Sequence, residues 1–129
     1  MRISEAARLS GLPDKTIRYY ESIGLLRSRR LDNGYRDYSP EGVQSLQFLR
    51  RARDLGFSIE DCRSLLALHD DPARASGDVK RVAEQRLQAI EKQLEELHLM
   101  RRTLEQLVTQ CPGDDSPDCA ILEGLETRP

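Results

Sequence analysis

The chain has 129 residues, of which 33% are charged and 38% hydrophobic, a composition typical of a soluble helical protein and unlike that of a membrane or disordered chain. Its length allows one compact domain, or a small domain with an extended element, around a modest core that has only two Phe, four Tyr and no Trp. The net charge of −2 conceals an asymmetry, because residues 1–54 hold 11 Lys and Arg against 7 Asp and Glu, whereas the remainder holds 9 against 15.

Two short helices joined by a tight turn are predicted at the start of the chain. Apolar residues recur at helical spacing over residues 3–10, and Gly11 then breaks the pattern. Asp14 is expected to cap a second helix that ends near Gly24. Such a pair forms a helix-turn-helix, here over about residues 4–23.

A small hairpin, the wing, is predicted over about residues 26–38. Asn33 and Gly34 lie between two short segments that can be strands, and this dipeptide is the strongest local signal for a two-residue hairpin turn. Two further helices follow, capped by Ser39 and Ser58. The first 70 residues therefore predict a winged helix-turn-helix domain.

The longest predicted element is a helix that Ser76 is expected to cap and that runs to about Gln110. At ~1.5 Å per residue it is roughly 50 Å long, which exceeds the size of a 70-residue domain. Its apolar residues advance by alternating steps of four and three, with one Arg among them: Ala83, Leu87, Ile90, Leu94, Leu97, Arg101, Leu104 and Val108. We call these residues the seam, and we expect residues 71–110 to form a linker and a dimerisation helix that pairs in a parallel or an antiparallel coiled coil.

Basic and aromatic side chains share one face of the second helix and continue into the wing. The candidate contacts are Lys15, Arg18 and Tyr19 on the helix and Tyr35, Arg36 and Tyr38 on the wing. Lys and Arg neutralise phosphates, Tyr can bond to them or pack on sugars, and a helix of this size fits the major groove. A solvated helix face looks similar, but the aromatic wing and the basic first half favour a DNA-binding surface.

The segments "ISEAARLSGLPDKTIRYYESIGLL", "NGYRDYS" and "LQFLRRARDLGFSIEDCRSLL" resemble the winged helix-turn-helix domain of the MerR family of bacterial transcription regulators. The resemblance covers about the first 70 residues. It implies a mainly α fold whose long helix pairs antiparallel with that of a second subunit, giving a homodimer. It also implies that the dimer binds double-stranded promoter DNA and distorts the promoter spacer so that RNA polymerase engages both promoter elements.

Two of the three cysteines, Cys111 and Cys119, flank a turn of Pro, Gly and Asp in "CPGDDSPDC". The start of the chain lacks a secretory signal and no apolar stretch is long enough to span a membrane, so we expect a cytoplasmic protein without a membrane partner. Reduced thiols are the rule there, which argues against a disulfide framework. Cys62, on an apolar helix face, is expected to be a buried structural residue.

A metal clip is the alternative reading of this turn. Its Asp residues lack the spacing of a calcium loop, and thiolates select soft or borderline metals. Zinc normally recruits four ligands, and two cysteines do not fill that shell. The spacing therefore favours a monovalent ion, Cu(I), Ag(I) or Au(I), which two thiolates satisfy.

"CPGDDSPDC", together with "ASGDVKR" at the start of the long helix, also resembles the subgroup of this family that senses monovalent metal ions. The resemblance makes Cys111 and Cys119 the metal ligands, and it puts Ser76 where divalent-sensing members have another cysteine. A bis-thiolate complex of a +1 ion carries charge −1, which the N-terminus of the long helix and Lys80 in its first turn can compensate. Ser76 and Lys80 are therefore expected beside the metal, supplied by the partner subunit as the resemblance implies.

The predicted function is a Cu(I)-responsive transcription regulator of metal-efflux or detoxification promoters, with Ag(I) and Au(I) as surrogates. The alternative is a thiol redox switch in which Cys111 and Cys119 form a disulfide under oxidation. An enzyme is not expected, because the sequence contains no Cys-x-x-Cys, no phosphate loop and no His-rich site. The remaining segment, residues 111–129, is predicted to hold the metal-binding loop and a C-terminal tail.

Overall fold

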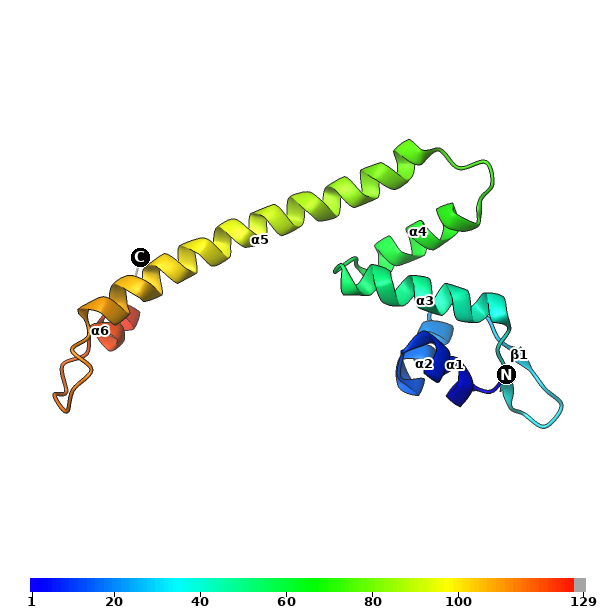
Figure 1. Ribbon diagram of the computed structural model, residues 1–129, viewed down its shortest axis with the longest axis horizontal. Helices are drawn as coiled ribbons and strands as arrows, with labels where there is room; N and C mark the ends of the chain where they lie inside the picture. The colour runs from blue at the N-terminus through cyan, green and yellow to red at the C-terminus, as the bar shows by residue number, and fades with distance from the viewer. Residues whose placement is uncertain (127–129) are drawn as a thin grey trace. The chain divides into compact units, whose positions relative to one another are not determined.

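The computed structural model describes residues 1–126 and confirms a mainly helical chain with a small wing and one long helix (Figure 1). The elements are α1 (Ile3–Ser10), α2 (Asp14–Ser22), β1 (Arg29–Arg30), β2 (Arg36–Asp37), α3 (Pro40–Asp54), α4 (Ile59–Asp70), α5 (Ser76–Gln110) and α6 (Ala120–Glu126). The chain divides into two compact units, Met1–Arg86 and a second unit that begins at Leu87. Residues 127–129 of the predicted tail lie outside the described residues.

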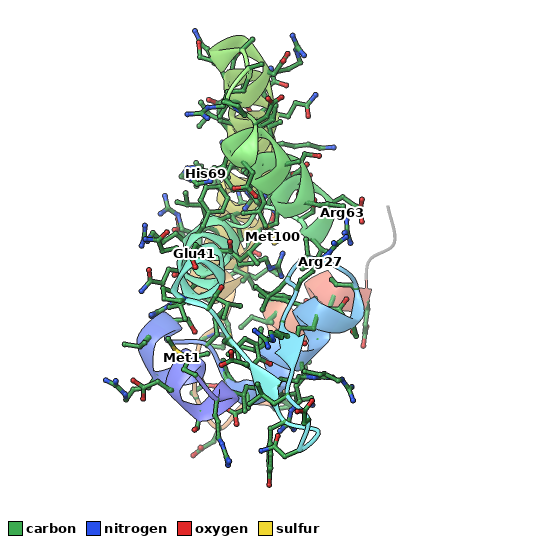
Figure 2. All side chains as sticks on the ribbon, turned by 90° about the vertical axis from the view of Figure 1, so that its right-hand side faces the viewer. Met1, Arg27, Glu41, Arg63, His69 and Met100 are labelled. Carbon is green, nitrogen blue, oxygen red and sulfur yellow. The ribbon has the colours of Figure 1, made fainter. Side chains whose placement is uncertain are left out.

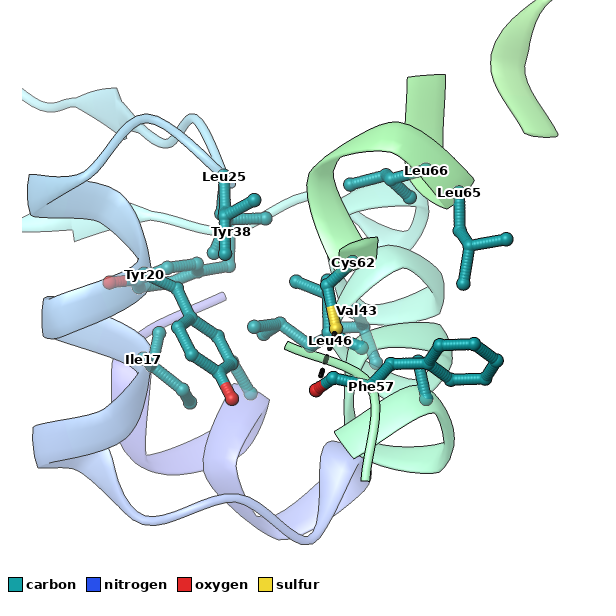
Figure 3. Close-up of a cluster of buried hydrophobic side chains, with 14 residues drawn as sticks. Ile17, Tyr20, Leu25, Tyr38, Val43, Leu46, Phe57, Cys62, Leu65 and Leu66 are labelled. Atoms are coloured by element: carbon teal, nitrogen blue, oxygen red, sulfur yellow. Dashed lines mark hydrogen bonds between the residues drawn. The ribbon is translucent and has the colours of Figure 1, made fainter. Parts of the chain in front are cut away.

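The first unit is organised around one apolar core to which α1 to α4 all contribute (Figure 3). Ile17 of α2 and Leu46 and Leu49 of α3 are completely buried there. Cys62 of α4 is buried among them, with its Sγ 3.9 Å from the carbonyl oxygen of Phe57, and burial raises the pKa of its thiol. The prediction that Cys62 is structural is therefore confirmed.

The helix ends follow the predicted caps in two cases and differ in two. Ser39 and Ser58 each accept a hydrogen bond, 3.0 Å long, from the backbone N–H three residues on. The predicted Asp14 cap is wrong, because Asp14 is the first helical residue of α2 and Pro13 occupies the cap position. An acidic side chain in a first turn still suits the positive end of the helix dipole. Ser76 is likewise the first residue of α5 instead of the residue before it.

The wing is an antiparallel hairpin whose loop is one residue longer than predicted. Its register pairs Arg29 with Asp37 and Arg30 with Arg36. The N–H of Leu31 donates to the carbonyl of Tyr35 at 2.8 Å, and the N–H of Gly34 donates back to Leu31 at 2.9 Å. Only Gly34 has a positive φ, of 83°, whereas the predicted two-residue turn needs a second one at Asn33. The side chain of Asn33 instead accepts from the N–H of Tyr35.

Most of the seam of α5 in the second unit is exposed to solvent, and Ile90 is half-buried. Leu94, Leu97, Leu104 and Val108 are each at least half exposed, and no residue of α5 is buried. Figure 2 shows side chains that end in nitrogen and oxygen atoms projecting to both sides of the first turns of α5, at the top of the view. A long apolar stripe facing water is typical of a helix that pairs with another chain. None of the helices within residues 1–126 has the length and apolar character needed to cross a membrane.

Candidate metal and DNA-binding sites

The two loop cysteines lie side by side. Their Sγ atoms are 3.9 Å apart, and both are free thiols. A disulfide bond would bring them to ~2.05 Å. Two metal–thiolate bonds of about 2.3 Å span ~3.8 Å at a tetrahedral angle and ~4.6 Å when collinear. The sulfur atoms are therefore spaced to share one ion with little movement of the backbone.

The ends of two helices position these thiols. Cys111 follows the last turn of α5, and its N–H donates to the carbonyl of Leu107 at 3.1 Å. Cys119 immediately precedes α6, and a bond from the backbone N–H of Leu122 lowers the pKa of its thiol, helped by the Cys111 thiol. The thiolate is the form of cysteine that binds metal, so the lowered pKa of Cys119 favours metal binding. A Cβ at Gly124 would lie 2.4 Å from Leu107, so this glycine allows α6 to pack closely on α5.

The acidic residues of the loop shape its turns. The carboxylate of Asp114 accepts a hydrogen bond of 2.9 Å from the N–H of Ser116. The hydroxyl of Ser116 accepts one of 3.2 Å from the backbone N–H of Asp118. Gly113 has a φ of 65°, a conformation that glycine adopts readily. Over residues 1–126 we find no group of three or more His, Cys, Asp and Glu side chains that could hold a metal ion. In a single chain, the donor set is the two thiols.

Ser76 and Lys80 are exposed on the first turns of α5. They belong to the first unit, whereas Cys111 follows the last turn of the same helix. Within one subunit the structure therefore does not bring them to the thiols.

The predicted DNA contacts on α2 and the wing are solvent-accessible with one exception. Tyr19 and Tyr35 are 51% and 54% exposed, Lys15 and Arg18 are exposed, and Arg36 is half-buried. The exception is Tyr38, which is only 1% exposed, so its assignment to the DNA surface is wrong. Tyr38 belongs to the core beside Tyr20 and Leu25 (Figure 3).

Glu21, which the sequence did not single out, ties the wing to α2. Its carboxylate accepts hydrogen bonds from the hydroxyls of Tyr38 and Ser28, and it pairs with Arg36 at 3.5 Å. Arg2 was also missed, and its guanidinium lies over the ring of Tyr35. Both contacts join residues far apart in the sequence, so local sequence patterns do not predict them.

Comparison with known proteins gives the family of the chain. A model described as "MerR HTH family regulatory protein" matches residues 1–68, and one described as "MerR, DNA binding" matches residues 43–107. The chain belongs to the MerR family. This confirms the winged helix-turn-helix fold and the transcription-regulator class predicted from the sequence.

Relatives match this MerR-family protein over almost its whole length. The regulator HmrR of Rhizobium leguminosarum bv. viciae is 57% identical over 125 residues, covering 97% of each chain. The regulator CueR of Escherichia coli O157:H7 is 45% identical over 126 residues, covering 97% of this chain and 93% of its own. The crystal structure of PbrR691 from Ralstonia metallidurans CH34 in complex with lead(II) is 32% identical, with a TM-score of 0.84 and coverage of 97% and 98%.

These matches make the protein a DNA-binding, metal-responsive transcriptional regulator of the MerR family. Regulators of this family bind promoter DNA as dimers. The relatives are transcriptional regulators and not enzymes, which confirms the prediction of a non-enzymatic protein.

The buried Tyr38 hydroxyl, which donates to Glu21, is expected to make this MerR-family protein less stable at alkaline pH. Burial, together with the bond to Glu21, raises the pKa of Tyr38 to about 12. The hydroxyl ionises near pH ~10 in the unfolded chain, so its contribution is complete below that pH and is lost as pH rises to about 12. We expect this part of the unfolding free energy to be about 2–3 kcal/mol.

Urea unfolding between pH 10 and 12 checks this expectation. Tyr38→Phe should lose less stability over that range than the unsubstituted protein, and Tyr19→Phe, which removes an exposed hydroxyl, should lose as much. Parallel losses in Tyr38→Phe and the unsubstituted protein would contradict the assigned role of Tyr38.

Proposed function

We propose that this MerR-family regulator responds to Cu(I), with Ag(I) and Au(I) as surrogates. In this proposal it activates metal-efflux or detoxification promoters by distorting the spacer DNA so that RNA polymerase engages both promoter elements. The observation that supports metal binding is the pair of thiols 3.9 Å apart at Cys111 and Cys119, and the choice of a monovalent ion rests on the described residues of one chain offering two such donors. The polymerase step rests on the family resemblance.

A monovalent ion suits this donor set better than a divalent one. Zinc takes four ligands, or three and a water, and the described residues of one chain offer two thiols. Cu(I) is a soft ion that thiolates select, and two of them satisfy it. The structure of the related PbrR691 is a complex with lead(II), a divalent ion, so the proposal of a monovalent ion rests on the two thiols of this chain.

The family resemblance implies an antiparallel homodimer, and the seam of α5 favours one particular register for it. In that register each of the eight seam residues meets another seam residue across a two-fold axis. The pairs are Ala83 with the partner's Val108, Leu87 with the partner's Leu104, Ile90 with the partner's Arg101, and Leu94 with the partner's Leu97. Shifting the helices by one heptad in either direction leaves seam residues at the ends without partners.

The same register brings the start of one α5 to the metal loop of the other subunit. Lys80 falls opposite Cys111 of the partner subunit, just after the end of the partner's α5, and Ser76 lies one turn further toward the partner's loop. The helix N-terminus, with a partial charge of roughly +0.5, and the Lys80 ammonium then compensate the −1 charge of a bis-thiolate complex. We therefore place Ser76 and Lys80 around the metal, contributed by the partner subunit.

On the DNA side, we propose that Lys15, Arg18, Tyr19, Tyr35 and Arg36 contact the operator. Their exposure on α2 and the wing supports this assignment. The fixed position of the wing also supports it, because Glu21 holds Arg36 to α2.

An anaerobic titration of the dimer with Cu(I), against a competing chelator of known affinity, tests the metal proposal. We expect one Cu(I) per subunit, bound much more tightly than Zn(II) under the same conditions. Absence of tight binding at this stoichiometry would overturn the proposal. If an oxidant then induced transcription through a Cys111–Cys119 disulfide, the thiol redox switch would replace it.

Ser76→Cys tests the proposed position of Ser76. A third thiolate beside the ion should raise the affinity for Zn(II) or Hg(II) and widen the transcriptional response to divalent metals. Ser76→Ala removes the hydroxyl without adding a ligand, so it should not widen the response. Unchanged selectivity in the Ser76→Cys protein would place residue 76 away from the metal.

A further inference from the structure

A basic groove lies between the first turn of α1, α2 and the wing. Its volume is about 410 Å³, and three arginines line it. Arg2 comes from the residue before α1, Arg18 from α2 and Arg36 from β2. Of these, the sequence pointed to Arg18 and Arg36 but not to Arg2.

Arg2 is held against the tip of the wing. The carbon at the centre of its guanidinium lies 4.2 Å from the centre of the Tyr35 ring, within the range of a cation–π contact. The neighbouring backbone is tied to the wing as well, because the N–H of Tyr38 donates to the carbonyl of Met1 at 2.7 Å. Arg2 therefore fixes the orientation of Tyr35, whose ring is otherwise half exposed.

The groove carries positive charge that the protein does not neutralise. Among the residues that the structure describes, neither Arg2 nor Arg18 has a carboxylate partner, and Arg36 has one in Glu21 at 3.5 Å. Ile3 and Ser4, in the first turn of α1, also line the groove, and no side chain caps this helix. A concave surface with this charge attracts an anion.

We propose that Arg2 is a DNA-contacting residue that binds one backbone phosphate of the operator together with Arg18 and Arg36. Its stacking also positions Tyr35 against the adjoining sugar. Guanidinium groups suit this task because their planar N–H donors match phosphate oxygens. The inference rests on the proposed DNA surface and extends it by one residue and one defined phosphate.

Equilibrium binding at several salt concentrations tests this inference. The probe is a duplex selected from random sequence by the full-length protein. Arg2→Ala removes one phosphate contact per subunit, so the plot of log affinity against log salt should become shallower by about two for the dimer. At ~0.15 M salt the affinity should fall roughly tenfold or more. Arg2→Lys should retain the salt slope, because it keeps the charge while losing the planar stack.

Arg8→Ala is the matched control. Arg8 lies on α1 outside the groove and pairs with Glu5 at 2.5 Å, so its loss should change neither affinity nor slope. A weaker affinity with an unchanged slope in Arg2→Ala would overturn the phosphate contact. If Arg18→Ala weakened binding and Arg2→Ala did not, only the Arg2 inference would fall. If neither did, the proposed DNA surface would fall with it.

Discussion

Replacing Cys111 or Cys119 with Ser is expected to abolish the transcriptional response to Cu(I) while leaving operator binding intact. Each thiol is half of the donor set, so its loss should lower Cu(I) affinity by more than the ~10- to 100-fold typical of changes around the ligands. Operator binding should survive because the basic groove and the exposed face of α2 belong to the other compact unit. Competition titration and gel-shift assays on the same purified proteins measure the two properties.

Cys62→Ala is the matched control for this experiment. It removes the third thiol, which is completely buried in the core of the first unit, so Cu(I) binding should be unchanged. Its effect should appear instead as a loss of about 1–2 kcal/mol in the free energy of unfolding. Loss of operator affinity in Cys111→Ser or Cys119→Ser would contradict the separation of sensing from DNA binding.

Introducing charge at the centre of the seam is expected to split the dimer. In the proposed register, Leu94 and the partner's Leu97 meet on both sides of the two-fold axis, so Leu94→Glu with Leu97→Glu removes four buried leucines. Leu94 and Leu97 are 50% and 58% exposed in one subunit, so the dimer buries about half of each side chain, and the loss is ~3–6 kcal/mol before repulsion between the carboxylates is counted. A nanomolar dimer has only ~12 kcal/mol of association free energy, so the variant should be monomeric at micromolar concentration.

Leu99→Glu is the control, because it shows whether the effect depends on position in the seam or only on replacing an exposed leucine. Leu97 and Leu99 are equally exposed in one subunit, at 58%, but Leu99 lies on the side of α5 away from the seam. Leu99→Glu should therefore remain dimeric by analytical ultracentrifugation and keep its operator affinity. The double variant should lose at least ~100-fold in operator affinity, because each half of a symmetric site is then bound alone. Equal disruption by Leu99→Glu would contradict the proposed seam.

The sequence predicted most reliably what local chemistry determines. The Ser39 and Ser58 caps, the wing and the long α5 depend on residues within one or two turns of each other. The seam could likewise be predicted from the regular spacing of its leucines in the sequence. Such features need no knowledge of the rest of the fold.

Two local details were wrong, the Asp14 cap and the two-residue turn of the wing. The other errors concern residues whose positions depend on contacts with residues far away in the sequence. Tyr38 has the composition of a wing contact, but Glu21, which lies 17 residues earlier, draws its hydroxyl into the core. The guanidinium of Arg2 stacks on the ring of Tyr35 in the wing, and nothing near the start of the sequence indicates that contact. The sequence identified both loop cysteines, but their 3.9 Å separation follows from the packing of α6 on α5.

In the proposed metal site, Cys111 and Cys119 hold one monovalent ion by themselves. X-ray absorption at the copper edge of the Cu(I)-loaded dimer tests it most directly, because the scattering reports the type and number of neighbours. We expect Cu(I) with two sulfur neighbours and no nitrogen or oxygen ligand. A site with three or four ligands, or one containing nitrogen or oxygen, would contradict it.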